Sequence, residues 1–314
     1  MAKILLTGAT GFLGSHIAEV LVQHGFTVRC TVRPSSSLKW LEHLNTEKIN
    51  VNFNDEASLQ KACEGVDVVI HNAGITRAKN DAEFFEVNTH ATERLAKAAI
   101  TARVSRFIFI SSLEARGPDG FSTTISAYGK SKLEAERRLS NLQNDIEVIL
   151  LRPAGVYGPR DTDLLTLFQL ANYGFLTVPA TNGRLQPVHG RDVAEAVLAT
   201  IQSKAQLGPF EIAEANTYSW QDMADMLEVA MSKKLRVLRI TREVFLGAGY
   251  ASETFSKLLN QAPKLDRRRA KSLAYYSYTC DTQPFKEAFS WQSRISLQDG
   301  LSETATWYKK QGWL

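Results

Sequence analysis

Short apolar segments alternate with amphipathic helical segments through the first half of the chain. The apolar segments cover residues 4–6, 27–32, 49–53, 66–70, 107–110 and 146–151. Such runs are typical of strands that are buried on both faces of a parallel sheet. Apolar positions at helical spacing lie between them, over 15–24, 57–63, 82–102 and 127–142. The alternation predicts an α/β fold in which helices cover a doubly wound parallel sheet.

The pattern changes after Arg152-Pro153, where Pro, Gly and aromatic residues interrupt shorter segments. Asp192 and Glu195 form a capping pair for a helix expected over 193–201. We further expect strands over 209–212 and 235–240, and helices over 220–231, 242–259 and 297–310. The prediction is a larger domain over 1–155, with returning segments near 188–213, and a smaller one over 156–187 and 214–314.

Composition excludes several function classes. The net charge of +4 over 314 residues is too small to indicate a nucleic-acid partner. Cys30, Cys63 and Cys280 are far apart, which predicts free thiols in a reducing compartment and no metal site. Met1 leads directly into the first strand and no apolar run reaches membrane-spanning length, so we expect a cytoplasmic protein with no membrane partner. The triplet 267–269 (Arg-Arg-Arg) is predicted to be a solvated helix face.

A glycine-rich turn joins the first strand to the first helix. It reads Gly8-Ala9-Thr10-Gly11-Phe12-Leu13-Gly14. Gly8 lets the chain leave the strand, Gly11 lets the backbone approach a pyrophosphate, and Gly14 lets the helix pack near the strand. The helix N-terminus presents unpaired N–H groups to phosphates. The turn predicts a dinucleotide site, in which we include Thr10, Phe12 and Leu13.

The end of the second strand predicts which dinucleotide binds. An acid there would bind the ribose 2′-OH of NAD, whereas an arginine would accommodate the 2′-phosphate of NADP. This chain has Arg33, three serines and Lys39 there, and no acid. The pattern favours NADP over NAD, because a guanidinium binds phosphate in a bidentate manner.

The next two strand ends complete the predicted cofactor site. Asn52 and Phe53 follow the third strand, where they would flank an adenine. Asn72, Ala73 and Gly74 follow the fourth, where small residues let the backbone pass close to the cofactor ribose. His71 is expected to be structural.

A serine, a tyrosine and a lysine form the predicted catalytic group. Tyr128 and Lys132 are four residues apart, so they share one helix face. A lysine ammonium lowers the pKa of a nearby tyrosine, which can then exchange a proton with a substrate oxygen. Ser111-Ser112 ends the fifth strand, at the sheet edge where ligands bind. One of these serines would bind the same substrate oxygen.

These motifs, together with the run from Arg152 to Pro159 (RPAGVYGP), resemble the extended short-chain dehydrogenase/reductases, the NAD-dependent epimerase/dehydratase family. The resemblance covers essentially the whole chain. It implies a Rossmann domain with about seven parallel strands and a smaller C-terminal α/β substrate domain. It implies Tyr128 as acid/base, Lys132 as its activator and ribose ligand, and Ser112 as the substrate-oxygen partner. It also implies Asn88, Pro153 and Val156 at the cofactor, and a homodimer.

Departures from the family pattern affect the predicted activity. Asn52 stands where the family often has an aspartate, although its amide oxygen can still accept from an adenine amine. Gly155 stands where sugar-nucleotide epimerases usually carry asparagine. The sequence therefore looks more like the reductase and hydroxysteroid dehydrogenase branch, which includes dihydroflavonol reductase-like proteins. We expect hydride transfer between NADP and a small carbonyl or alcohol substrate.

Two alternative functions and a set of pocket candidates complete the prediction. A sugar-nucleotide epimerase or dehydratase would recycle a tightly bound cofactor, and Arg160 and Arg184 would contact its diphosphate. A non-catalytic NADP sensor would use the same fold. The candidates for lining the substrate pocket are Arg160, Leu164, Phe168, Tyr173 and Phe175. Helical spacing favours the core for Leu164 and Phe168, and His189 is expected to be packed.

Overall fold

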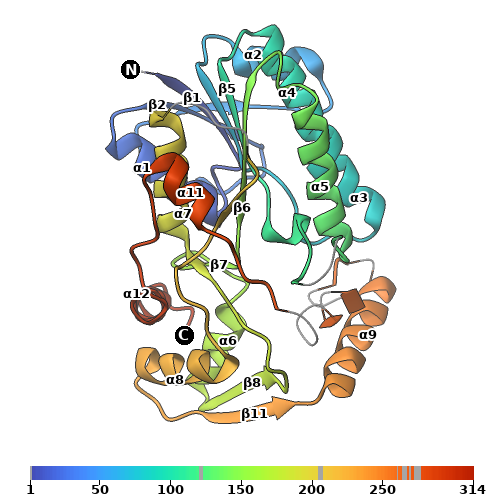
Figure 1. Cartoon of the computed structure of the whole chain (residues 1–314), viewed down its shortest axis with the longest axis vertical. Helices are drawn as coiled ribbons and strands as arrows, with labels where there is room; N and C mark the ends of the chain where they lie inside the picture. The colour runs from blue at the N-terminus through green and yellow to red at the C-terminus, as the bar shows by residue number, and fades with distance from the viewer. Residues whose placement is uncertain are drawn as a thin grey trace.

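The computed structural model describes residues 2–119, 123–203, 208–259, 261–263, 267–268, 270–271 and 277–314. Seven parallel strands form the main sheet in the order β10-β6-β5-β4-β1-β2-β3 (Figure 1). They are β1 (Lys3–Thr7), β2 (Thr27–Val32), β3 (Glu47–Asn50), β4 (Val68–His71), β5 (Arg106–Ile110), β6 (Glu147–Pro153) and β10 (Phe210–Ile212). The predicted Rossmann sheet is confirmed. Its strand order reverses between β1 and β4, where ligands bind in such folds.

Helices cover both faces of this sheet. One face carries α1 (Phe12–Gln23), α7 (Gly190–Gln202) and α11 (Gln283–Phe289), and the other carries α2 (Glu56–Cys63), α4 (Ala91–Thr101) and α5 (Ala127–Ser140). Side chains alternate between faces along a strand. Accordingly, Ile4 and Leu6 belong to one core and Leu5 to the other. Phe285 of α11 packs in the first core, so the chain returns to the sheet late in the sequence.

A third core holds the smaller part of the molecule together. It includes Tyr157, Phe168, Leu227, Leu301 and Tyr308. Its elements are α6 (Leu165–Asn172), β8 (Phe175–Pro179), α8 (Trp220–Met231), β11 (Arg236–Ile240) and α12 (Leu297–Lys310). β8 pairs with β11, and β7 (Val156–Tyr157) pairs with β9 (Val188–His189). Helix α9 (Arg242–Leu258) follows β11 and projects from the edge of the molecule (Figure 1).

The helix expected over 82–102 is interrupted. It consists of α3 (Asp81–Phe85), a π-helical turn η1 (Glu86–His90) and α4. Asn88 lies in this turn with its side chain fully buried, donating to the Ile75 carbonyl at 3.0 Å and to Ser131 Oγ at 3.1 Å. π-turns within helices are frequent at functional sites. Helical periodicity alone did not predict this π-helical turn.

Two local predictions were wrong, each because a side chain binds the backbone. The third strand ends at Asn50 rather than Phe53, since Asn52 Oδ1 accepts from Asn54 N and forms a turn. The helix after β9 begins at Gly190, and its N-cap is His189, whose Nδ1 accepts from Arg191 N. The carboxylate of Asp192 accepts instead from the N–H groups of residues 294 and 295. In the described part of the chain, no helix is both long and apolar enough to cross a membrane.

Candidate active site

The glycine-rich turn closes tightly between β1 and α1. Gly8 has a φ of +70°, a conformation that favours glycine. A Cβ added to Gly14 would lie 2.0 Å from the Gly8 carbonyl oxygen. A Cβ on Gly11 would meet only that oxygen, at 3.4 Å. Gly11 is the N-cap of α1 and no side chain caps the first turn, so its N–H groups suit a phosphate.

A cavity of about 510 Å³ opens beside this turn, and we call it the glycine-turn cavity. Most of the predicted cofactor residues line it: Gly8, Thr10, Gly11, Arg33, Asn52, Phe53, Asn72, Ala73 and Gly74. They come from the carboxyl ends of β1, β2 and β4 and from the segment after β3. The open space at Gly11 and the uncapped helix end therefore fit a bound dinucleotide.

Several predicted cofactor residues lie outside the lining of this cavity. They are Phe12, Leu13, Gly14, Lys39, Asn88, Tyr128, Lys132, Pro153 and Val156. Phe12 to Gly14 form the first turn of α1, whose N–H groups face the phosphate position. Lys39 points elsewhere: its Nζ donates to Gln311 Oε1 at 3.1 Å and lies 4.4 Å from the Trp40 ring centroid. We therefore leave Lys39 out of the proposed site.

Arg33 lies exposed at the rim of the cavity. Its N–H donates to Ser36 Oγ at 3.1 Å, and Ser36 N donates back to the Arg33 carbonyl at 2.9 Å. Ser36, which also lines the cavity, thus closes the turn that presents the guanidinium.

Arg94 of α4 is a lining residue that sequence reasoning missed. Its Nε donates to the Phe53 carbonyl at 2.8 Å, and its Nη2 donates to Asn54 Oδ1 and Glu86 Oε1, each at 2.8 Å. These contacts fix the segment expected beside the adenine. Asn54 lies 40 residues from Arg94 in the sequence, and Glu86 lies 8 residues away. Both separations exceed the three or four residues that bring side chains together on a helix, so no local pattern predicted these contacts.

Lys132 lies buried behind the cavity wall. Its Nζ donates to the Ile110 carbonyl at 2.8 Å and lies 4.6 Å from the Phe109 ring centroid. Burial lowers the pKa of Lys132 to about 8, although the nearby Glu136 carboxylate acts to raise it. A Cβ on Gly74 would lie 3.4 Å from this Nζ and 3.0 Å from Asn88 Oδ1. Lys132 and Asn88 therefore meet beside a glycine of the predicted cofactor site.

The two serines after β5 have different environments. Ser111 is buried, and its Oγ donates to Glu136 Oε1 at 2.5 Å. Glu136 also pairs with Arg152, so Ser111 belongs to a structural network. Ser112 is half-buried, and its Oγ accepts from Glu114 N at 3.2 Å. Its hydroxyl proton remains available to a substrate oxygen, which agrees with the choice of Ser112.

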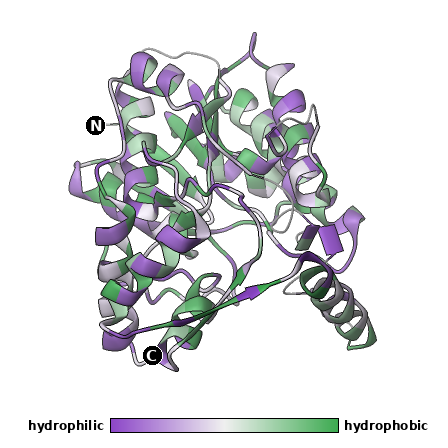
Figure 2. Ribbon diagram, turned by 60° about the horizontal axis from the view of Figure 1, so that its bottom comes forward, coloured by the Kyte–Doolittle hydropathy of each residue, from purple (hydrophilic) through white to green (hydrophobic). Residues whose placement is uncertain are grey.

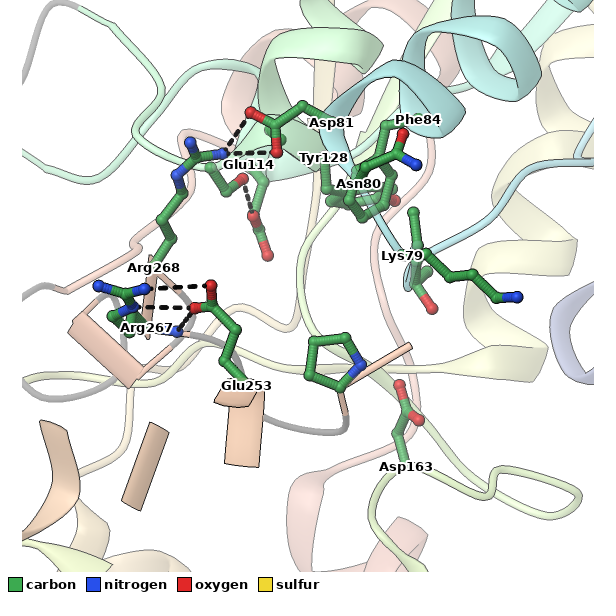
Figure 3. Close-up of a pocket in the computed structure, with 15 residues that line it drawn as sticks. Lys79, Asn80, Asp81, Phe84, Glu114, Tyr128, Asp163, Glu253, Arg267 and Arg268 are labelled. Carbon is green, nitrogen blue, oxygen red and sulfur yellow. Dashed lines mark hydrogen bonds and ion pairs between the residues drawn. The ribbon is translucent and has the colours of Figure 1, made fainter. Parts of the chain in front are cut away.

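Tyr128 lines a second cavity of about 630 Å³, which we call the Tyr128 cavity (Figure 3). Its ring centroid lies 6.1 Å from that of Phe84. Ser126 caps α5 by accepting from Gly129 N at 2.8 Å, and its Oγ donates to Glu114 Oε2 at 2.5 Å. Ser112 is not part of the lining of either cavity. The segment after β4 connects the two sites, because residues 71–75 line one cavity and Thr76 to Asp81 contribute to the other.

Two ion pairs lie at the Tyr128 cavity (Figure 3). Arg267 Nε lies 3.1 Å from Glu253 Oε2, and Arg268 Nη1 lies 2.8 Å from Asp81 Oδ2. The basic triplet was predicted to be a solvated helix face; Arg267 and Arg268 are exposed, as predicted, and they also line the cavity. Arg269 lies outside the described residues. The carboxylate partners belong to α9 and α3, which sequence patterns did not bring together.

The other pocket candidates lie away from this cavity. Phe168 is buried in the third core, as helical spacing favoured, and Leu164 packs against that core. Tyr173 and Phe175 are exposed. Arg160 Nη1 donates to Ser15 Oγ at 3.0 Å, and its Nη2 pairs with Glu19. Arg184 donates to Thr217 and lines a third cavity, near α8.

His71 and His189 are both structural, as expected. His71 is buried between Thr7 Oγ1 at 2.7 Å and Thr92 Oγ1 at 2.9 Å. Burial lowers the pKa of both His71 and His189 to about 3, so both rings are neutral near pH 7. Among the described residues, no group of His, Cys, Asp and Glu could hold a metal ion.

Comparison with known proteins identifies one family. The model of the NAD dependent epimerase/dehydratase family matches residues 4–213. A ceramide reductase of Caulobacter vibrioides is 31% identical over 99% of this chain and 96% of its own length. A UDP-glucose 4-epimerase of Vibrio cholerae is 28% identical over 96% of this chain and 94% of its own. The structure of a UDP-glucuronic acid 4-epimerase from Bacillus cereus with NAD has a TM-score of 0.78 at 21% identity, over 98% of this chain and 96% of that one.

The family match spans the glycine-rich turn, Ser112, Tyr128 and Lys132. It agrees with the sheet order and with the glycine-turn cavity at the end of β1. The expected enzyme class, an oxidoreductase of the extended short-chain type that uses a nicotinamide adenine dinucleotide, is thereby confirmed. The chain belongs to the NAD-dependent epimerase/dehydratase family.

Proposed function

We propose that this enzyme is an NADP(H)-dependent reductase that interconverts a ketone and an alcohol on an amphiphilic small molecule. One observation supports the proposal most directly. Tyr128 lines the larger cavity, whereas Lys132, one turn further along α5, is buried beside Gly74 of the glycine-turn cavity. One helix thus carries a proton donor on the substrate side and an ammonium on the cofactor side.

The three predicted catalytic residues have separate tasks in this proposal. When bound, the cofactor supplies or accepts the hydride at its nicotinamide. Tyr128 gives its phenolic proton to the substrate oxygen during reduction and takes it back during oxidation. Lys132 favours the phenolate by its charge, and the Ile110 carbonyl holds its Nζ in place. Ser112 donates a hydrogen bond that orients the substrate oxygen.

Arg33 supports NADP as the preferred form of the cofactor. Its guanidinium lies at the rim of the glycine-turn cavity, on a turn closed by Ser36. Residues 33–39, directly after β2, contain no carboxylate that could bind a ribose 2′-OH. The similar epimerase structure from Bacillus cereus contains NAD, so a comparison of NADPH with NADH tests this assignment directly.

The relatives suggest two substrate classes, and the side chains here favour one. The ceramide reductase relative makes a lipid ketone the first class to test. The epimerase relative makes a sugar nucleotide the second. Arg160 and Arg184, the cations expected for a diphosphate, bind Glu19 and Thr217 instead. Three cations line the Tyr128 cavity: Arg267 and Arg268 already pair with carboxylates, and Lys79 is exposed at the surface. We therefore favour the reductase.

NADPH oxidation in the presence of long-chain ketones tests the proposal. Tyr128→Phe should abolish turnover while NADPH still binds, because only the acidic proton is lost. Tyr173→Phe is the matched control, since Tyr173 is 79% exposed and away from both cavities. Unchanged turnover in Tyr128→Phe would contradict the catalytic assignment. Epimerisation of UDP-glucose without net NADPH oxidation would favour the alternative.

Two further expectations belong to the same proposal. We propose a homodimer formed through α4 and α5. The outer sides of these helices carry a linked set of charges, in which Glu93 pairs with Lys97 at 2.7 Å and with Arg138 at 2.5 Å. Sedimentation velocity at several concentrations measures the association, and a monomer throughout would contradict it. Cytoplasmic location stays a prediction.

A further inference from the structure

We propose that α9 is a docking helix that binds the surface of an anionic lipid bilayer. The inference concerns binding alone, so it does not depend on the proposed activity. It also replaces our expectation of no membrane partner, which rested only on the lack of a spanning segment. A helix that lies on a bilayer needs an apolar stripe and nearby cations rather than a long apolar run.

An apolar stripe runs along the outer side of α9. It consists of Val244, Ala248, Ala251, Phe255 and Leu258. Their spacing of three or four residues places them on one side of the helix. All five are exposed, including Phe255 at 63% and Leu258 at 82%. Contiguous exposed apolar residues mark interaction sites in soluble proteins.

The opposite side of α9 belongs to the Tyr128 cavity. Glu253 is two residues from Phe255, which places it about 200° around the helix. Its carboxylate pairs with Arg267, and Arg267 lies 4.2 Å from the Tyr250 ring centroid. The helix therefore turns its polar side inward and its apolar stripe outward. It projects from the edge of the molecule in two views, with hydrophobic residues along its length (Figure 2).

Charge identifies the occupant of this surface. Residues 233–271, which contain α9, hold eleven Lys and Arg against three Asp and Glu. That segment thus carries a net charge of +8, which leaves −4 on the rest of a chain whose total is +4. Exposed cations precede α9 on β11, at Arg236 and Arg239. Basic residues beside an apolar helix face are attracted to anionic lipid headgroups.

The same charge argues against a second copy of the chain as the occupant. A symmetric dimer through the stripe would bring together two copies of a chain segment that is rich in Lys and Arg. An anionic bilayer instead neutralises them. Docking would also place the Tyr128 cavity near the lipid surface, because Glu253 of α9 lines that cavity.

Flotation of the full-length protein with phosphatidylcholine vesicles, with and without phosphatidylglycerol, tests the inference. We expect binding to the anionic vesicles that weakens in high salt. The double variant Phe255→Ser/Leu258→Ser should weaken binding at least about tenfold, since both apolar contacts are lost. Val229→Ser on α8 is the control, because Val229 is 65% exposed but lies outside α9. Melting temperature and NADPH affinity report whether each variant remains folded.

Three outcomes would overturn the inference. The wild-type protein would fail to float with anionic vesicles, or the double variant would float as well as the wild type. Alternatively, sedimentation would show a wild-type dimer that the double variant converts to monomer, without vesicle binding. The stripe would then be an interface between copies. None of these measurements needs substrate, so they are separate from the test of catalysis.

Discussion

Gly11 and Gly14, two of the three glycines of the glycine-rich turn, should respond to substitution by alanine in opposite ways. In Gly14→Ala the new Cβ would lie 2.0 Å from the Gly8 carbonyl oxygen and 2.7 Å from its carbon. Real Cβ atoms essentially never approach closer than 3.0 Å. The obstructing atoms are backbone, so α1 must move outward by about an ångström, and such overpacking costs about 1–3 kcal/mol or more.

Two other effects of Gly14→Ala change that cost in opposite directions. Alanine is favoured over glycine inside a helix by about 1 kcal/mol. The displaced helix also loses contacts of Ile17 and Leu21 with the core, which adds to the loss. We expect a net destabilisation of about 2 kcal/mol. In a chain of this size, that lowers the melting temperature by about 5 °C.

Gly11→Ala should spare the fold and impair the cofactor. Its Cβ meets only one atom, at 3.4 Å, and the Gly11 backbone has a φ of −82° that alanine readily adopts. The free energy of unfolding should therefore change by less than about 0.5 kcal/mol. The methyl group lies where the pyrophosphate must approach, so NADPH affinity should fall at least about tenfold.

Thermal unfolding without cofactor and fluorescence titration with NADPH measure both effects on the same samples. A melting temperature of Gly14→Ala equal to that of the wild type would refute the predicted overpacking. An unchanged NADPH affinity of Gly11→Ala would contradict the predicted loss of binding, because the close approach at that glycine would then be unnecessary.

Three further predictions concern single side chains. Burial lowers the pKa of Lys132 in the folded protein to about 8, so between pH 8 and 10.5 the unfolded chain keeps a proton that the folded protein has released. The free energy of unfolding of the wild type should therefore rise by about 2–3 kcal/mol relative to that of Lys132→Met over this pH range. Urea unfolding measures the difference, and a difference that stays constant with pH would contradict the prediction. Arg33→Ser should raise the KM for NADPH at least about tenfold and leave the KM for NADH nearly unchanged. Arg137→Ser, on the exposed side of α5, is the control. Equal effects on the two KM values would refute the NADP assignment. Asn88→Ala should cost about 1–3 kcal/mol, because the Ile75 N–H and carbonyl both lose their partner; a melting temperature equal to that of wild type would show that water replaces the amide.

The sequence by itself determined the features that depend on neighbours in the chain. Apolar runs predicted the strands, because a parallel strand is buried on both faces whatever its partners are. The glycine spacing predicted the turn, since the need for a positive φ at Gly8 and for space at Gly14 arises within eight residues. Tyr128 and Lys132 share one side of α5 for the same reason.

Only the tertiary structure decided where long side chains end. Lys39 was expected at the cofactor, yet it donates to Gln311, 272 residues away. Arg268 is exposed, as expected, but it also pairs with Asp81 across 187 residues at the Tyr128 cavity, which no sequence pattern predicted. Such contacts depend on which elements the fold brings together, and a flexible cation pairs with whichever carboxylate or carbonyl lies within its reach. The periodicity of the sequence gives no information about contacts between residues that are so far apart along the chain.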